Sequence, residues 1–120
     1  PMSDWLSIHP YLIEDTPESR LRYQAMLDEY GAVARETGKP LMATEACWGS
    51  LSDAARVENA RFTLGELKQR KIGWLVYVLH HSLIADAHRP EFGPVGFPGN
   101  LAFIEADGTL RPGHDFFNEF

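Results

Sequence analysis

A glutamate at the end of a short apolar segment is the residue in this sequence best placed to do chemistry. Glu45 directly follows the segment 41–44, and Gly38 and Pro40 mark a stop just before that segment. The segment is too short for a helix and apolar on both faces, which is typical of a covered parallel strand. In α/β barrels and open α/β sheets, ligands bind at the carboxyl ends of such strands. The pattern favours a functional carboxylate at position 45, and a merely solvated strand-end glutamate is the alternative.

Other reactive residue types occur without the spacing that their chemistry requires. His80, His81, Asp86 and His88 are of metal-ligating types, but their spacing matches no standard metal motif. Cys47 is the single cysteine, so an internal disulfide is excluded, and no histidine is paired with it by sequence as a nucleophile would need. We therefore expect no metal site, no cofactor and an inert thiol.

Length and composition are those of one globular domain. The chain has 120 residues, of which 44% are hydrophobic and 12% aromatic, enough for a packed core. The longest apolar run, 72–79, is far shorter than the ~20 residues that cross a bilayer, so we expect a soluble protein of undetermined compartment. Pro1 before Met2 is expected to remain from a purification tag.

The charge pattern narrows the choice of partners. The net charge is −6 and the basic residues are scattered through the expected helices, so no basic face for a phosphate backbone is present. Nucleic acid and membrane partners are therefore not expected. A neutral ligand such as a sugar is compatible with this charge.

Strands alternate with helices along the chain. We expect strands over 5–8, 41–44 and 72–79, with helices over about 17–37 and 53–70 between them. The mid-strand residues recur every 34 to 36 residues, close to the ~31 residues of one unit in a βα barrel. The sequence therefore predicts three successive βα units with parallel strands in order along the sheet, right-handed crossovers and helices on one face.

Local signals mark the ends of the two helices. Thr16 before Pro17 is an N-cap followed by proline at the first helical position, and Gly38 closes the same helix. Ser50 with Asp53 three residues later reads as a capping box for the second helix.

The last third of the chain has a different character. Residues 80–100 are rich in glycine and proline without a sustained period, which predicts a long functional loop. Asp107-Gly108 lies between the short β-prone runs 101–104 and 109–111, a hairpin signal. Residues 112–120 can add a final helical turn or two.

Several of these segments together resemble a known family. His9-Pro10-Tyr11, Gly38-Lys39-Pro40 before Thr44-Glu45, and Asp107-Gly108-Thr109 stand in the order and spacing found in retaining glycoside hydrolases of the cellulase-like (β/α)8-barrel clan. The resemblance covers nearly the whole chain, from the sixth to the eighth βα unit. It implies an α/β fold, a partial TIM (β/α)8 barrel of about three βα units plus a C-terminal hairpin, in a single domain 1–120.

The resemblance also implies roles for five residues. Glu45 matches the nucleophile that forms a glycosyl-enzyme intermediate with a β-linked sugar. Tyr11 matches the tyrosine that hydrogen-bonds the nucleophile, and His9 the histidine that helps hold the sugar beside the scissile bond. Tyr77 stands where most relatives carry a tryptophan platform for the sugar ring. Trp48 is equally compatible with contact to the sugar and with packing in the core.

One part of the family's machinery is missing. The family's acid/base is a glutamate preceded by asparagine after the fourth strand, and the only such pair here, Asn118-Glu119, follows no strand. A retaining mechanism needs two carboxyl groups, so the isolated chain is expected to be inactive. Trp74, by its strand parity, is expected to be a packing residue. An independent carbohydrate-binding module is disfavoured, because such modules are usually antiparallel sandwiches.

The alternative to an enzyme segment is a truncated, non-catalytic fragment. An open parallel sheet exposes strand edges, and we expect it to self-associate or to pair with a missing N-terminal part of the barrel. The surface that would meet the missing strands is predicted to be apolar in Ile8, Met42, Leu75 and Val78.

Overall fold

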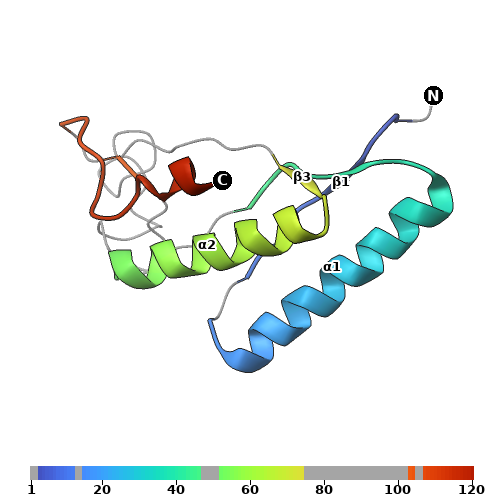
Figure 1. The fold of residues 1–120 in the computed structure, drawn as a ribbon, viewed down its shortest axis with the longest axis horizontal. Coiled ribbons are helices and arrows are strands. Elements are labelled where there is room, and N and C mark those ends of the chain that lie inside the picture. The colour runs from blue at the N-terminus through green and yellow to red at the C-terminus, as the bar shows by residue number, and fades with distance from the viewer. Residues whose placement is uncertain (1–2, 13–14, 47–51, 75–102, 105–106) are drawn as a thin grey trace, which may run out of the picture. The chain divides into compact units, whose positions relative to one another are not determined.

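The architecture is α/β. The computed structural model describes residues 3–12, 15–46, 52–74, 103–104 and 107–120. In chain order the elements are β1 (Leu6–Ile8), α1 (Pro17–Thr37), β2 (Leu41–Ala43), α2 (Asp53–Gln69), β3 (Gly73–Trp74) and the 3-10 helix η2 (Phe116–Glu119) (Figure 1). The chain divides into two compact units, one formed by 1–46 with 62–76 and the other by 47–61 with 77–120.

The long helix α1 has the boundaries that its capping residues predict. Thr16 has an extended backbone, and its Oγ1 accepts a hydrogen bond from the Ser19 N–H at 3.1 Å. At the other end Gly38 adopts a left-handed conformation with φ +66°, which glycine tolerates without a Cβ clash. The N–H of Lys39 donates to the Ala34 carbonyl at 3.1 Å, and the chain turns sharply into β2 (Figure 1).

The second helix begins where predicted but with a different cap. Ser52 Oγ accepts a hydrogen bond from the Ala55 N–H at 3.3 Å, while its carbonyl accepts the N–H of Arg56 at 3.0 Å. Ser52 is therefore the N-cap of α2, because its hydroxyl reaches a first-turn N–H that has no partner within the helix. Ser50, which the capping-box pattern singled out, lies outside the described residues.

The three short strands pair in parallel and in the predicted order β1-β2-β3. Ile8 pairs with Ala43, and Ala43 with Trp74, so these three residues share one face of the sheet. Apolar side chains of α1 and of the second half of α2 cover that face. The buried cluster comprises Ile8, Leu12, Tyr23, Leu27, Leu41, Ala43, Leu67 and Ile72, and Trp74 packs against it as predicted.

The opposite face of the sheet carries Ser7, Met42 and Gly73, which are also partners in the strand register. The prediction that Ile8 lies on this face with Met42 was wrong. Successive strand residues point to opposite sides, and Ile8 pairs with Ala43, so its side chain belongs to the helix-covered core. This face, opposite the helices, is therefore more polar than expected, with the exposed Ser7 beside the half-buried Met42.

In the second unit, the C-terminal segment makes a tight turn and ends in a short helix. Ile104 and Leu110 form one antiparallel bridge, and the Arg111 N–H donates to the Phe103 carbonyl at 2.9 Å. Asp107 Oδ1 accepts the Thr109 N–H at 2.9 Å inside the turn. The predicted hairpin is thus present as a single bridge, and η2 provides the predicted final helical turn.

Some sequence predictions concern residues that lie outside the ranges that the structure describes. The remainder of the third predicted strand, with Leu75 and Val78, and the long loop 80–100 fall there. Neither α1 nor α2 is both long and apolar enough to cross a membrane, within the residues that the structure describes.

Candidate active site

Three side chains named from the sequence meet at one edge of the sheet. His9 follows β1 directly, Tyr11 comes two residues later, and Glu45 lies two residues beyond β2. Because β1 and β2 are parallel neighbours, their carboxyl ends lie at the same edge. Tyr11 donates its hydroxyl proton to Glu45 Oε2, and His9 Nδ1 lies 3.1 Å from the same oxygen. We call His9, Tyr11 and Glu45 the Glu45 cluster.

The two oxygens of Glu45 have different surroundings. Oε2 takes both contacts, from the Tyr11 hydroxyl and from His9 Nδ1. Within the described ranges no group donates a hydrogen bond to Oε1. The side chains of His9 and Glu45 are 55% and 44% exposed, so a ligand can reach them.

This asymmetry suits a carboxylate that reacts through one oxygen. The hydrogen bond from Tyr11 to Oε2 orients the carboxyl group, while Oε1, which has no donor among the described residues, is left to approach an electrophilic carbon. A strand-end position adds stiffness, since the sheet sets the backbone that carries the reacting group. The geometry can therefore support nucleophilic attack, or proton abstraction, from the open side of Glu45.

The other predicted site residues cannot be placed in this cluster. Trp48 and Tyr77 lie outside the described residues, as do Cys47 and the histidines and aspartate at 80, 81, 86 and 88. Among the residues that are described, no three histidine, cysteine or acidic side chains gather closely enough to hold a metal ion.

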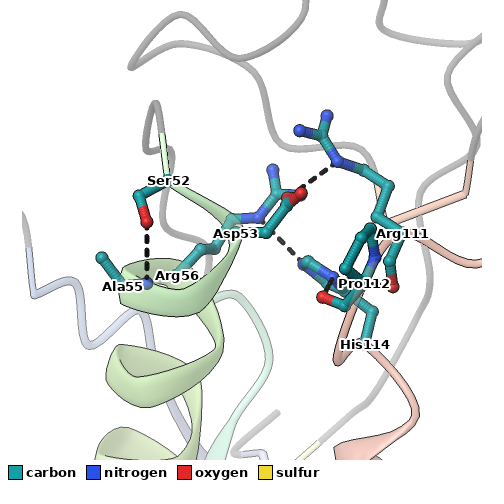
Figure 2. Close-up of polar contacts among 7 residues, drawn as sticks. All are labelled: Ser52, Asp53, Ala55, Arg56, Arg111, Pro112 and His114. Atoms are coloured by element: carbon teal, nitrogen blue, oxygen red, sulfur yellow. Dashed lines mark hydrogen bonds and ion pairs between the residues drawn. The ribbon is translucent and has the colours of Figure 1, made fainter.

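A second polar cluster, which the sequence analysis did not identify, lies in the second unit. Arg56 is 1% exposed, and its Nε donates to His114 Nε2 at 3.0 Å. Asp53 Oδ1 accepts from Arg56 NH2 at 3.2 Å and from Arg111 Nε at 2.9 Å. Figure 2 shows Asp53 and Arg56 on the first turns of α2, reaching Arg111 and His114 of the C-terminal segment. We call Asp53, Arg56, Arg111 and His114 the Arg56 cluster.

The contacts of His114 define its protonation state. Since Nε2 accepts from Arg56, the ring proton sits on Nδ1, which lies 3.0 Å from the Pro112 carbonyl. Burial lowers the pKa of His114 below its usual value, and the positive charge of Arg56 lowers it further. The imidazole is therefore neutral, and its ring packs on Phe103 with 4.7 Å between the ring centroids.

The Arg56 cluster closes the C-terminal segment onto the start of α2. Between Arg111 and His114 the chain passes close to the helix at Gly113, which has φ +75° and where a Cβ would lie 3.5 Å from Val57. A charged residue in a helix is usually exposed to solvent, so the residue type of Arg56 did not predict that it would be buried. The available signal was its position: Arg56 stands four residues before Ala60 and next to Val57, so it borders apolar residues of α2.

Comparisons with models of known protein families, with curated proteins and with solved structures found no significant match.

Proposed function

We propose that this chain is the C-terminal segment of a retaining glycoside hydrolase that acts on β-linked sugars, with Glu45 as the nucleophile. In this proposal the three parallel strands belong to a (β/α)8 barrel of the cellulase-like clan, and a glutamate outside this chain supplies the acid/base. The observation that carries the proposal is the Glu45 cluster, in which Tyr11 and His9 both contact Oε2 and no group in the described part of the chain donates to Oε1.

The roles follow from the chemistry of retaining hydrolysis. Glu45 attacks the anomeric carbon and forms a glycosyl-enzyme ester, which water later cleaves. Tyr11 keeps the attacking carboxylate oriented through its hydrogen bond to Oε2. His9, with more than half of its side chain exposed, is placed to contact the sugar. Trp48 and Tyr77 are proposed to pack against sugar rings, as aromatic faces do.

A test of the nucleophile needs a substrate that requires no acid. A 2,4-dinitrophenyl 2-deoxy-2-fluoro-β-glycoside has a leaving group that departs unprotonated, and its fluorine slows hydrolysis of the ester so that the adduct accumulates. The chain is incubated with the gluco, manno and galacto forms at high concentration. We expect intact mass spectrometry to show one added fluoro-sugar, and peptide mapping to locate it on Glu45.

One test variant and one control variant accompany that experiment. Glu45→Gln removes the nucleophile and should abolish the adduct, whereas Glu36→Gln, an exposed glutamate on α1, should leave it unchanged. Absence of an adduct with all three sugars, or an equal adduct in Glu45→Gln, would contradict the proposal.

The alternative function is that of a non-catalytic fragment that self-associates. It is favoured by the position of β1, which among the described strands has a partner on only one side. An unpaired strand edge is a template for another chain. This alternative would be favoured if the chain forms no adduct with the fluoro-glycosides and light scattering shows that it is a dimer or larger.

A further inference from the structure

Two hydroxyl groups join the strands just below the Glu45 cluster. The side chains of Ser7 and Thr44 share a hydrogen bond across β1 and β2. Ser7 pairs with Met42 in the strand register, so Thr44, two residues further along, projects from the same face of the sheet. This face lies opposite the buried core, so the bond lies outside the packing that holds the helices to the sheet.

A backbone bond lies beside this hydroxyl pair. The Thr44 N–H donates to the Ile8 carbonyl at 3.1 Å, one step beyond the last residue of β2. Two links therefore join the strands at the point where regular pairing ends. The next residue on one side is Glu45, and the next on the other is His9.

The side chains of the Glu45 cluster are partly exposed. His9 and Glu45 are about half exposed, so packing does not restrict their side chains as it restricts the core. Their mutual distance depends on where the two strand ends place their backbones. Loss of the Ser7–Thr44 hydrogen bond would let the two strand ends separate. Oε2 of Glu45 would then no longer contact both Tyr11 and His9.

We propose that Ser7 and Thr44 are positioning residues, whose shared hydrogen bond sets the distance between His9 and Glu45. Calling them positioning residues for a nucleophile rests on the function proposed above. The geometric claim, that the hydroxyl pair maintains the His9–Glu45 contact, does not depend on it.

The test reads the His9 tautomer by nitrogen NMR in alkaline buffer. In the wild-type chain we expect the Glu45 carboxylate, 3.1 Å from His9 Nδ1, to favour the proton on Nδ1, whereas an unrestrained imidazole favours the proton on Nε2. We expect Ser7→Ala and Thr44→Val each to shift His9 toward the Nε2–H tautomer. Thr44→Ser, which keeps the hydroxyl, should retain the wild-type ratio.

Controls separate this effect from a general loss of structure. Thr37→Val removes an exposed hydroxyl on α1 that bonds the Val33 carbonyl at 2.8 Å, and it should leave the His9 tautomer unchanged. Circular dichroism checks that each variant is folded. If Thr44→Val unfolds the chain, Ser7→Ala, a change at an exposed position, carries the test alone. A wild-type tautomer ratio in folded Ser7→Ala would overturn the inference.

The labelling reaction distinguishes failure of this inference from failure of the proposed function. We expect Thr44→Val to slow labelling by the fluoro-glycoside roughly tenfold, since small displacements of reacting groups cost rate. A chain that is never labelled, yet whose His9 tautomer responds to Ser7→Ala, loses the proposed function and keeps the positioning pair. A chain labelled at Glu45 with no tautomer response loses only the positioning pair.

Discussion

The Glu45 cluster and the Arg56 cluster combine similar residue types in opposite surroundings. Each contains a carboxylate and a histidine and brings together residues distant in the sequence. In the first, His9 and Glu45 are about half exposed and gathered at strand ends. In the second, Arg56 and His114 are each 1% exposed and bond to each other.

This difference in exposure separates a site from a structural device. A half-exposed carboxylate such as Glu45 can exchange water for a ligand. The buried guanidinium of Arg56 and imidazole of His114 bond to each other instead of to water. Removing either partner therefore leaves a buried polar group without a hydrogen bond. Substitutions in the Arg56 cluster should therefore change stability, and substitutions in the Glu45 cluster should change reactivity.

The largest expected effect is that of Arg56→Ala. The substitution leaves Asp53 and His114 without their shared donor and opens a cavity, which we expect to lower the free energy of unfolding by about 3 kcal/mol. Urea denaturation followed by circular dichroism measures it.

A matched control for this substitution is Arg61→Ala. Arg61 lies one helical turn and a half further along α2 and pairs with Glu119 at the surface, so its removal should change the urea midpoint only slightly. Equal midpoints for the two variants would mean that the Arg56 cluster is not a structural device.

A smaller effect is expected from His114 as the pH changes. Its pKa is lowered in the folded chain from the usual 6.5. Below pH 6.5 the unfolded chain therefore binds a proton that the folded chain does not, and the free energy of unfolding decreases as the pH falls until the folded imidazole also titrates. Above pH 6.5 His114 is neutral in the folded and in the unfolded chain, so its full contribution to the free energy of unfolding is present.

The His114→Gln variant isolates that contribution. A glutamine carbonyl can accept the Arg56 Nε–H in place of Nε2 but does not titrate. Urea midpoints measured from neutral pH downward should fall more steeply in the wild-type chain than in the variant. Parallel curves would show that His114 is not held neutral, which would weaken the contrast between the two clusters.

The smallest expected effect on stability belongs to Tyr11→Phe. Tyr11 is exposed, and its hydroxyl bonds a half-exposed carboxylate, so the free energy of unfolding should change by no more than about 0.5 kcal/mol. Labelling of Glu45 by the fluoro-glycoside should nevertheless slow, because Oε2 loses a donor. A large drop in the urea midpoint would assign the Glu45 cluster a structural role as well.

The sequence by itself determined the elements of the first unit. Thr16, Pro17 and Gly38 act through contacts within a few residues, so the ends of α1 could be predicted from local chemistry alone. The alternation of apolar strands with amphipathic helices likewise predicted a parallel sheet with both helices on one face. Glu45 could be singled out because strand ends are functional edges in such folds.

Only the tertiary structure decided the side-chain environments. The face on which Ile8 lies depends on its pairing with Ala43, because a shift of one residue in register reverses every side chain of a strand. The burial of Arg56 depends on His114, 58 residues away, and no local pattern encodes that contact. Ser7 and Thr44, 37 residues apart, meet for the same reason: strand pairing brings together residues that the sequence keeps separate.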